Sequence, residues 1–277
     1  MIEFQRKMGP FKIKEIWFSD DIYDVEGVDA VQFRNANFTG DKPGFTREAS
    51  TTLIIDLTQS LDDIWKAMDK NATRHNISRA QSDGTIAVLF NEKYDEYDAI
   101  NRDFRKRKGL PSAMIPMEEM KKNYFLSTYE KDGVVLGGHL CIKDKRSFRL
   151  LLACNSMTPE STFSRSIYGR ANKLSIWEMI KFAKEEGVEE FDFGGFATGQ
   201  QAEDLKGINE FKLSFGGVVA EKNSYSKTYS KSFDMSKSIY LSAVSAGHRI
   251  GNMTRRKAEK AVEKPQETEA EPAQKSG

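Results

Sequence analysis

The sequence predicts an α+β protein in which a set of antiparallel strands is followed by alternating helices and strands. Strand candidates at residues 124–129, 134–142 and 148–154 are separated by short polar turns, which is typical of an antiparallel meander. The elements that follow are a helix, a strand, a second helix and a further strand, at residues 166–186, 188–193, 203–213 and 217–222. This order along the chain indicates the α+β class.

Composition restricts the class of protein further. The chain has 277 residues, with 42 basic and 41 acidic side chains and a formal net charge of +1. This balance excludes a uniformly basic coat for nucleic acid. Three histidines and two cysteines show no zinc-site spacing, so no metal site is expected. Cys141 and Cys154 lie in apolar, strand-like segments and are expected to be reduced core residues.

Four parts of the chain differ in composition. Residues 1–115 mix apolar strands with charged helices, and residues 116–233 are richer in strands. Residues 234–257 are predicted to form a basic helix, because five cations and no acid lie within 235–257. Residues 258–277 carry three lysines, five glutamates and almost nothing to bury, so they are predicted to be disordered.

The first part contains one strongly signalled helix. Ser60 followed by Asp63 resembles a capping box and starts a helix that runs on to Gly84. Strands are expected before and after this helix, at residues 50–57 and 85–90. A charged helix over about 92–108 completes this part of the chain.

Two stretches of the second part carry a family resemblance. Residues 174–195 combine a helix that ends in glycine with a strand end of the form aromatic-Asp-aromatic-Gly-Gly, and residues 208–217 contain F-K-x-x-F-G. Together they resemble the second GNAT-type lobe of the Fem (FemABX) peptidyltransferase family. Residues 65–84 are similar to the family's R-x-x-I-x-x-A helix ending in glycine. The resemblance covers about residues 50–230.

The resemblance implies a GNAT-like acyltransferase fold of two lobes, the first (1–115) reduced and the second (116–233) complete. It also implies a reaction, the transfer of an amino acid from aminoacyl-tRNA to an amine of a peptidoglycan precursor, with no further cofactor. Relatives use the same body for other acyl transfers in envelope or polysaccharide synthesis. The chain is shorter than full-length Fem transferases and shows no coiled-coil arm.

The family's catalytic lysine matches Lys212, and its neighbouring aromatic residue matches Phe211. Acyl transfer passes through a tetrahedral oxyanion that a fixed cation stabilises. The alternative for Lys212 is a solvent-facing lysine whose stem lies over Phe211.

Asp192 precedes Gly194 and Gly195 at the carboxyl end of a strand, where ligands gather in open α/β sheets and glycines allow close approach. These three residues are expected on the substrate side. The alternative for Asp192 is a turn cap.

Several cations form a candidate phosphate site. Lys66, Lys70 and Arg74 follow one another at i, i+4 and i+8, which places them on one stripe of the expected helix, with His75 and Arg79 nearby. Arg74 and Arg79 belong to the family-like helix and are expected to hold a phosphate of a nucleotide-linked acceptor or of tRNA. An ordinary solvated helix face is the alternative.

The stretch S-I-Y-G-R-A at residues 166–171 has two interpretations. Gly169 and Ala171 fit the pyrophosphate loop of CoA-dependent GNAT enzymes, although Ser166 replaces its long polar residue, and Arg170 is a candidate substrate-binding residue. Otherwise the stretch is a helix start with Arg165 and Arg170 in its first turn. A CoA-dependent N- or O-acyltransferase therefore stays open as a second function, and a non-catalytic GNAT-like binding module as a third.

The chain is expected to be cytoplasmic. The N-terminal residues lack the apolar core of a secretory leader, and no stretch approaches 18 apolar residues. The basic segment 235–257 either lies on the anionic inner face of the cell membrane, where lipid-linked precursors reside, or docks on the body of the protein.

Overall fold

The computed structural model describes residues 1–111, 115–199 and 201–236. In these residues ten strands form one mixed sheet, in the order β1-β2-β3-β10-β4-β9-β8-β7-β6-β5. Its neighbouring strands are antiparallel, except for the parallel pairs β2 with β3 and β8 with β9. The strands are β1 (Ile2–Met8), β2 (Phe11–Trp17), β3 (Ala30–Ala36), β4 (Thr46–Asp56), β5 (Ile86–Phe90), β6 (Phe125–Lys131), β7 (Val134–Lys143), β8 (Ser147–Asn155), β9 (Glu190–Gly195) and β10 (Val218–Thr228).

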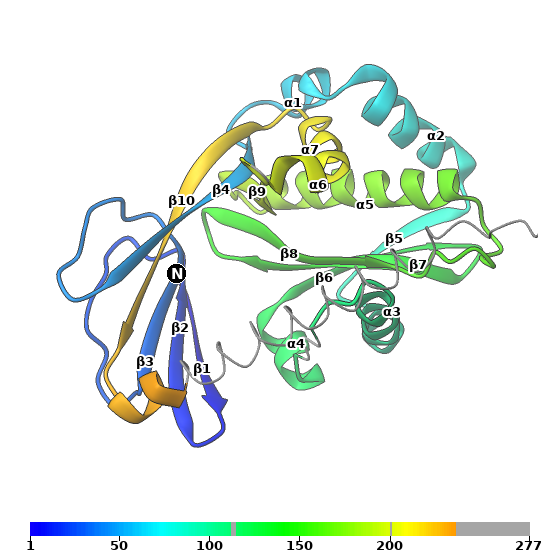
Figure 1. Ribbon diagram of the computed structural model, residues 1–277. Helices are drawn as coiled ribbons and strands as arrows, with labels where there is room; N and C mark the ends of the chain where they lie inside the picture. Colours follow the sequence, from blue (N-terminus) through cyan, green and yellow to red (C-terminus); the bar gives the residue numbers. More distant parts are fainter. Residues whose placement is uncertain (112–114, 200, 237–277) are drawn as a thin grey trace, which may run out of the picture.

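Helices cover both faces of the strands β5–β8. Helix α5 packs on β5, β6 and β7 from one side, and α3 packs on β7 and β8 from the other (Figure 1). The helices are α1 (Leu61–Ala67), the π-helix η1 (Lys70–Arg74), α2 (His75–Asp83), α3 (Tyr94–Arg107), α4 (Met117–Asn123), α5 (Arg165–Glu185), α6 (Gln201–Asp204) and α7 (Lys206–Leu213).

The main core lies between α5 and the sheet. Met179 and Ile180 of α5 are fully buried there, together with a run of aromatic rings from successive strands. Phe148 of β8 stacks on Phe191 of β9, with ring centroids 5.5 Å apart, and Phe193 continues the run. Every second residue of β9 therefore faces this core, and the residues between them face the opposite side of the sheet.

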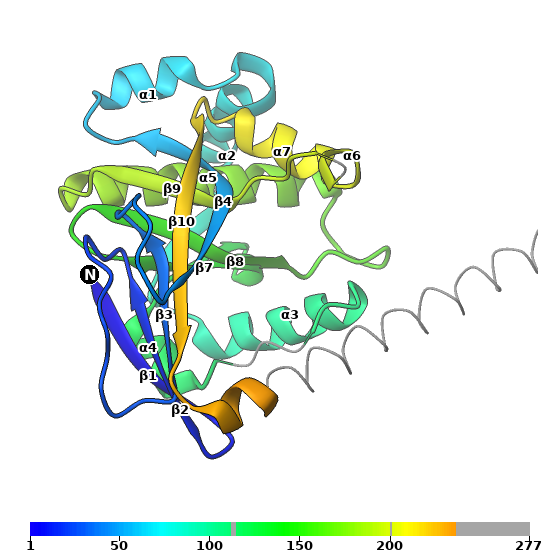
Figure 2. The same ribbon diagram turned by 60° about the vertical axis from the view of Figure 1, so that its left-hand side comes forward.

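Strands β4 and β10 lie between two arms of the sheet, one formed by β1–β3 and the other by β5–β9. Each has eleven residues, and they pair from Val218 with Ile54 to Ser226 with Thr46. The other edge of β10 pairs with β3, so a strand from the C-terminal part of the chain joins the N-terminal strands. Figure 2 shows β10 running from α7 down to the ends of β2 and β3.

Most of the expected elements are confirmed. Strands β6, β7 and β8 form the antiparallel meander, and α5 is followed by Gly187 with φ +75°. Ser60 caps α1, since its hydroxyl accepts a hydrogen bond from the Asp63 N–H at 3.1 Å. The stretch after residue 223 continues β10. The strands β1–β3 and helix α4 were not assigned from the sequence.

The continuous helix expected from Ser60 to Gly84 is wrong. Met68 has an extended backbone, with ψ 146°, and Asp69 begins a new helix because its carboxylate accepts from the N–H groups of Asn71 and Ala72. The segment is therefore divided into α1, η1 and α2. Lys66, Lys70 and Arg74 do not share one helical stripe. Residues 203–213 are likewise divided, with Leu205 between α6 and α7.

The division of the chain near residue 115 stays a prediction. β5 and β6, which come from the two sides of that boundary, are hydrogen-bonded neighbours in the sheet. The predictions of a basic helix within 234–257 and of a tail at 258–277 concern residues that lie, from 237 onward, outside the described part.

Within the described ranges, no helix is long and apolar enough to cross a membrane, and no three His, Cys, Asp or Glu side chains form a group that could hold a metal ion. Cys141 and Cys154 are free and buried, as expected from the sequence.

Candidate active site

Lys212 lies in the last turn of α7, and its side chain reaches back to the end of β9. The Nζ atom donates a hydrogen bond to the carbonyl oxygen of Gly195 and lies 3.4 Å from that of Gly194. The side chain is half-buried, and this burial lowers the pKa of its ammonium. Because an ammonium has three N–H groups, one donor is left after these two carbonyls.

The F-K-x-x-F-G motif fixes α7 against the junction of α1 and η1. Phe215 is fully buried, and its ring meets that of Phe211 edge-on at 5.4 Å. The Ser214 hydroxyl donates to the Phe211 carbonyl at 2.7 Å and lies 2.6 Å from the Thr73 hydroxyl. The Asp69 N–H donates to the Ser214 carbonyl at 2.9 Å. The motif is thus a docking element as well as the carrier of Lys212.

Gly216 closes the motif because no other residue fits there. Its φ is +81°, in the region that favours glycine, and an added Cβ would lie 2.5 Å from the backbone oxygen of Ala67. The end of α7 can therefore approach the end of α1 closely enough for the Ser214 contacts to form.

Lys212 lies where two strands part. β8 and β9 pair in parallel over residues 147–149 and 190–192, and the pairing ends at Arg149 with Asp192. Beyond that point β8 continues beside β7, whereas β9 stays beside β4. The backbone turns at Gly194, with φ +73°, and this turn presents the carbonyls that hold Lys212.

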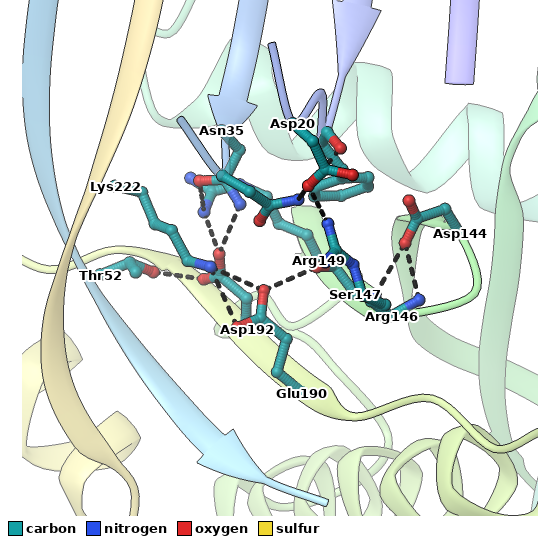
Figure 3. Close-up of polar contacts among 12 residues, drawn as sticks. Asp20, Asn35, Thr52, Asp144, Arg146, Ser147, Arg149, Glu190, Asp192 and Lys222 are labelled. Carbon is teal, nitrogen blue, oxygen red and sulfur yellow. Dashed lines mark hydrogen bonds and ion pairs between the residues drawn. The ribbon is translucent and has the colours of Figure 1, made fainter. Parts of the chain in front are cut away.

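Asp192 lies beneath this turn and is fully buried. Its carboxylate accepts hydrogen bonds from the Gly194 N–H at 2.7 Å, the Asn35 side chain at 3.2 Å, the Thr52 hydroxyl and the Arg149 guanidinium (Figure 3). A carboxylate offers about four lone-pair sites, and these donors fill them. Asp192 therefore caps the turn, as in the alternative interpretation, and its expected place on the substrate side stays a prediction.

A family model matches the part of the chain that holds this site. The family model described as Acetyltransferase (GNAT) domain matches residues 67–212, more than half of the chain. The chain belongs to the GNAT acetyltransferase-domain family. The match includes Asp192, Gly194, Gly195 and Lys212. No curated protein matches the chain.

Solved structures share the fold of this GNAT chain at low sequence identity. FemX is 13% identical and has a TM-score of 0.60, over 83% of this chain and 85% of that one. The C-terminal domain of a putative lysylphosphatidylglycerol synthetase from Agrobacterium fabrum is 14% identical, with a TM-score of 0.52 over 82% and 81%. L-PGS from Bacillus licheniformis is 11% identical, with a TM-score of 0.50 over 84% and 83%. These likenesses confirm the GNAT-like fold, and FemX agrees with the resemblance to the Fem family.

The stretch 166–171 forms the first turns of α5 rather than a loop before that helix. Helix α5 begins at Arg165, so Gly169 and Ala171 lie inside it. The Nε atom of Arg170 lies 3.4 Å from the Ser166 carbonyl one turn earlier. The helix-start interpretation therefore describes this stretch of the GNAT chain.

The three predicted arginines lie on η1, α2 and α5. Arg74 ends η1, and its buried Nε has no hydrogen-bond partner among the described residues. Arg79 is exposed on α2. The structure therefore brings Lys212 together with Phe211, Gly194, Gly195 and Asp192, and the part of the three arginines in the site stays a prediction.

Sequence reasoning missed two cations of the site, Arg149 and Lys173. Lys173 of α5 donates to the Ala72 carbonyl and lies 5.8 Å from the centre of the Phe211 ring. Its burial lowers the pKa of the ammonium, and Asp69 opposes that lowering. The sequence holds a weak signal for Lys173, which follows Arg170 by one helical turn. Arg149 has none, because only the parallel register of β8 and β9 places it opposite Asp192.

Proposed function

We propose that this GNAT chain is a Fem-like acyltransferase that moves an aminoacyl group from aminoacyl-tRNA to an amine of a cell-envelope precursor. The observation that carries the proposal is the half-buried Lys212 ammonium, held by the Gly194 and Gly195 carbonyls where β8 and β9 part. The family assignment supports acyl transfer as the reaction class.

In the proposed reaction the acceptor amine attacks the carbonyl carbon of the ester that joins the amino acid to tRNA. A C–N bond forms, the carbonyl π electrons move to oxygen, and the free N–H of Lys212 donates a hydrogen bond to that oxyanion. Collapse of the intermediate breaks the C–O bond, and the ribose oxygen leaves with the proton that the amine gives up. A fixed donor at this place contributes about 2.7–4 kcal/mol to transition-state stability.

Phe211 acts beside Lys212 in this proposal. Its ring lies between the buried ring of Phe215 and the Lys173 ammonium, so it keeps water away from one side of α7. Exclusion of water strengthens the interaction between the Lys212 ammonium and a developing oxyanion.

The structural neighbours support an aminoacyl donor and an envelope acceptor. FemX carries the name of the Fem family, which the motifs of this chain resemble. A lysylphosphatidylglycerol synthetase is named for an aminoacylated lipid. We infer a nucleotide-linked or lipid-linked acceptor, and a cytoplasmic protein that meets it at the inner face of the membrane. Residues 235–257, mostly outside the described part, are the candidate for contact with anionic lipid.

Arg74, Arg79 and Arg170 are assigned to phosphate groups of the acceptor or of tRNA. Arg74 offers a buried Nε with no protein acceptor in the described residues. A phosphate oxygen would satisfy that donor through a charge-assisted hydrogen bond.

Retention of labelled aminoacyl-tRNA on the purified protein tests the donor. Uncharged tRNA is the control, and acetyl-CoA is the competitor. We expect preferential retention of the charged form at any acetyl-CoA concentration. Equal retention of both forms, or none, would overturn the tRNA donor.

The second candidate function is CoA-dependent N- or O-acyl transfer in polysaccharide or lipid biosynthesis. The acetyltransferase description of the matching family favours it. Displacement of the charged tRNA by acetyl-CoA, or binding of acetyl-CoA alone, would place it first. Binding of tRNA without turnover, unaffected by Lys212→Ala, would indicate the third candidate, a non-catalytic module.

A further inference from the structure

A buried ion pair, Arg149 with Asp192, lies directly beneath the turn that holds Lys212. We propose that Asp192 and Arg149 are positioning residues, which hold the turn whose carbonyls bind the Lys212 ammonium and place two opposite, buried charges beneath it. This inference rests on the proposed function, because it assigns a role to residues that act through Lys212.

The positional part follows from the turn at the end of β9. Asp192 accepts the Gly194 N–H at 2.7 Å and so holds one side of the residue whose carbonyl, in the next peptide, faces Lys212. An added Cβ at Gly194 would lie 2.8 Å from the Leu150 carbonyl, which shows that the turn is pressed against β8. A shift of Asp192 would therefore move both carbonyls that hold the Lys212 Nζ atom.

The charges of the pair are enclosed by protein. The Asp192 side chain is 0% exposed and that of Arg149 is 14% exposed. Asn35 bridges the two, since it donates to Asp192 at 3.2 Å and accepts from Arg149 at 3.0 Å. The Thr52 hydroxyl completes the set from β4. Little water separates these charges from each other, so their fields are weakly screened.

The two charges act on Lys212 in opposite directions. Asp192, from β9, raises the pKa of the Lys212 ammonium, and Arg149, from β8, lowers it, against a background of burial that lowers it further. Elements that contact α7 also carry Lys173 of α5, at the Phe211 ring, Asp69 before η1, at Ser214, and Glu203 and Asp204 of α6. Because the pair is neutral as a whole, removal of either member exposes Lys212 to one uncompensated charge.

A direct titration of Lys212 tests the proposal without any need for turnover. Protein labelled with ¹³C at the lysine ε carbon is titrated by NMR, and the signal of Lys212 is assigned by its loss in Lys212→Arg. The variants are Asp192→Asn, Arg149→Met and the double variant. The matched control is Glu190→Gln, which removes a carboxylate from the same strand and the same face, where Glu190 pairs with Lys222.

We expect Asp192→Asn to lower the pKa of Lys212 and Arg149→Met to raise it, each by about one pH unit. The double variant should return close to the wild-type pKa, and Glu190→Gln should leave it unchanged. Arg149→Lys keeps the charge and should titrate like the wild type. In transfer assays, the pH at which the rate changes should move in the same directions.

Shifts in the same direction, or none in folded variants, would overturn the proposal, since a merely structural role predicts no opposition of sign. Asp192→Asn and Arg149→Met each leave one buried charge without its partner, and such a variant can fail to fold for that reason alone. In that case the double variant and Arg149→Lys decide: a Lys212 pKa far from the wild-type value in either would overturn the proposal. Failure of the proposed function shows separately, as absence of transfer by a wild-type protein whose Lys212 titrates as expected.

Discussion

Burial of Lys212 links the chemistry proposed for the site to a cost in fold stability. An ammonium held against two carbonyls is preorganised for an oxyanion and needs little rearrangement when negative charge develops. The same burial removes water from a cation, which lowers its pKa below the usual value of 10.5. One residue therefore carries two separate expectations, one for rate and one for stability.

Lys212→Met should reduce the rate of transfer by about 100- to 1000-fold, because it removes the oxyanion donor and keeps the length of the side chain. Lys212→Arg should retain part of the rate, since it keeps a donor with different geometry. Circular dichroism should show an unchanged fold. Lys206→Met, an exposed lysine of the same helix, is the control and should be as active as the wild type. Full activity in Lys212→Met would remove this lysine from the reaction.

Fold stability should depend on pH through the same residue. Since the folded-state pKa of Lys212 is lowered, the unfolded chain binds more protons in the window between that pKa and about 10.5. The free energy of unfolding of the wild type, relative to Lys212→Met, should therefore rise with pH through this window. Urea unfolding of both proteins from pH 7.5 to 10 measures it, and a falling difference would contradict the burial effect.

At the scale of elements, the sequence motif F-K-x-x-F-G is a contact between helices. Ser214 and Gly216 hold the end of α7 against Ala67, Asp69 and Thr73, at the point where α1 gives way to η1. The interruption at Met68 and Asp69 is what brings these backbone groups within reach. The break in the helix and the glycine in the motif are thus two parts of one contact.

Gly216→Ala should lower the free energy of unfolding by about 1–3 kcal/mol from its backbone conformation alone, and by more because its Cβ meets the Ala67 backbone. Gly169→Ala is the matched control. An added Cβ at Gly169 has nothing within 4 Å, and the residue lies inside α5, so the change should stabilise by about 0.5–1 kcal/mol. Denaturant unfolding compares the two, and equal effects would contradict the close contact at Gly216.

For the whole molecule, β10 makes the two arms of the sheet depend on each other. It pairs with β3 on one edge and with β4 on the other. Its partners lie far back in the chain, from 164 residues earlier for Val218 with Ile54 to 198 residues earlier for Thr228 with Ala30. The hydrogen bond between Arg149 and Asn35 joins β8 to β3. The polar contacts in Figure 3 therefore cross between the arms.

A chain that ends at residue 215 should fail to fold cooperatively, because β3 and β4 lose their shared partner. A chain that ends at residue 257, without the segment predicted to be disordered, should melt close to the full-length protein. Thermal unfolding followed by circular dichroism tests both. A cooperative transition in the shorter chain would show that the arms fold independently of β10.

Elements with local signals can be predicted from the sequence alone. The meander of β6–β8, helix α5 with its glycine end, the Ser60 cap and the F-K-x-x-F-G motif with Lys212 all depend on periodicity, capping residues or short spacing.

The role of Asp192 and the contacts at the helix break depend on tertiary structure. Asp192 has the same neighbours in sequence whether it binds substrate or caps a turn, and only the approach of Arg149, Asn35 and Thr52 fills its oxygens. At the break, the Asp69 carboxylate caps η1 locally, but its N–H bonds to Ser214, 145 residues later, and no local pattern contains that contact. Periodicity reports which face of an element is buried, but the partner that buries it comes from elsewhere in the chain, and the role of a polar side chain depends on that partner.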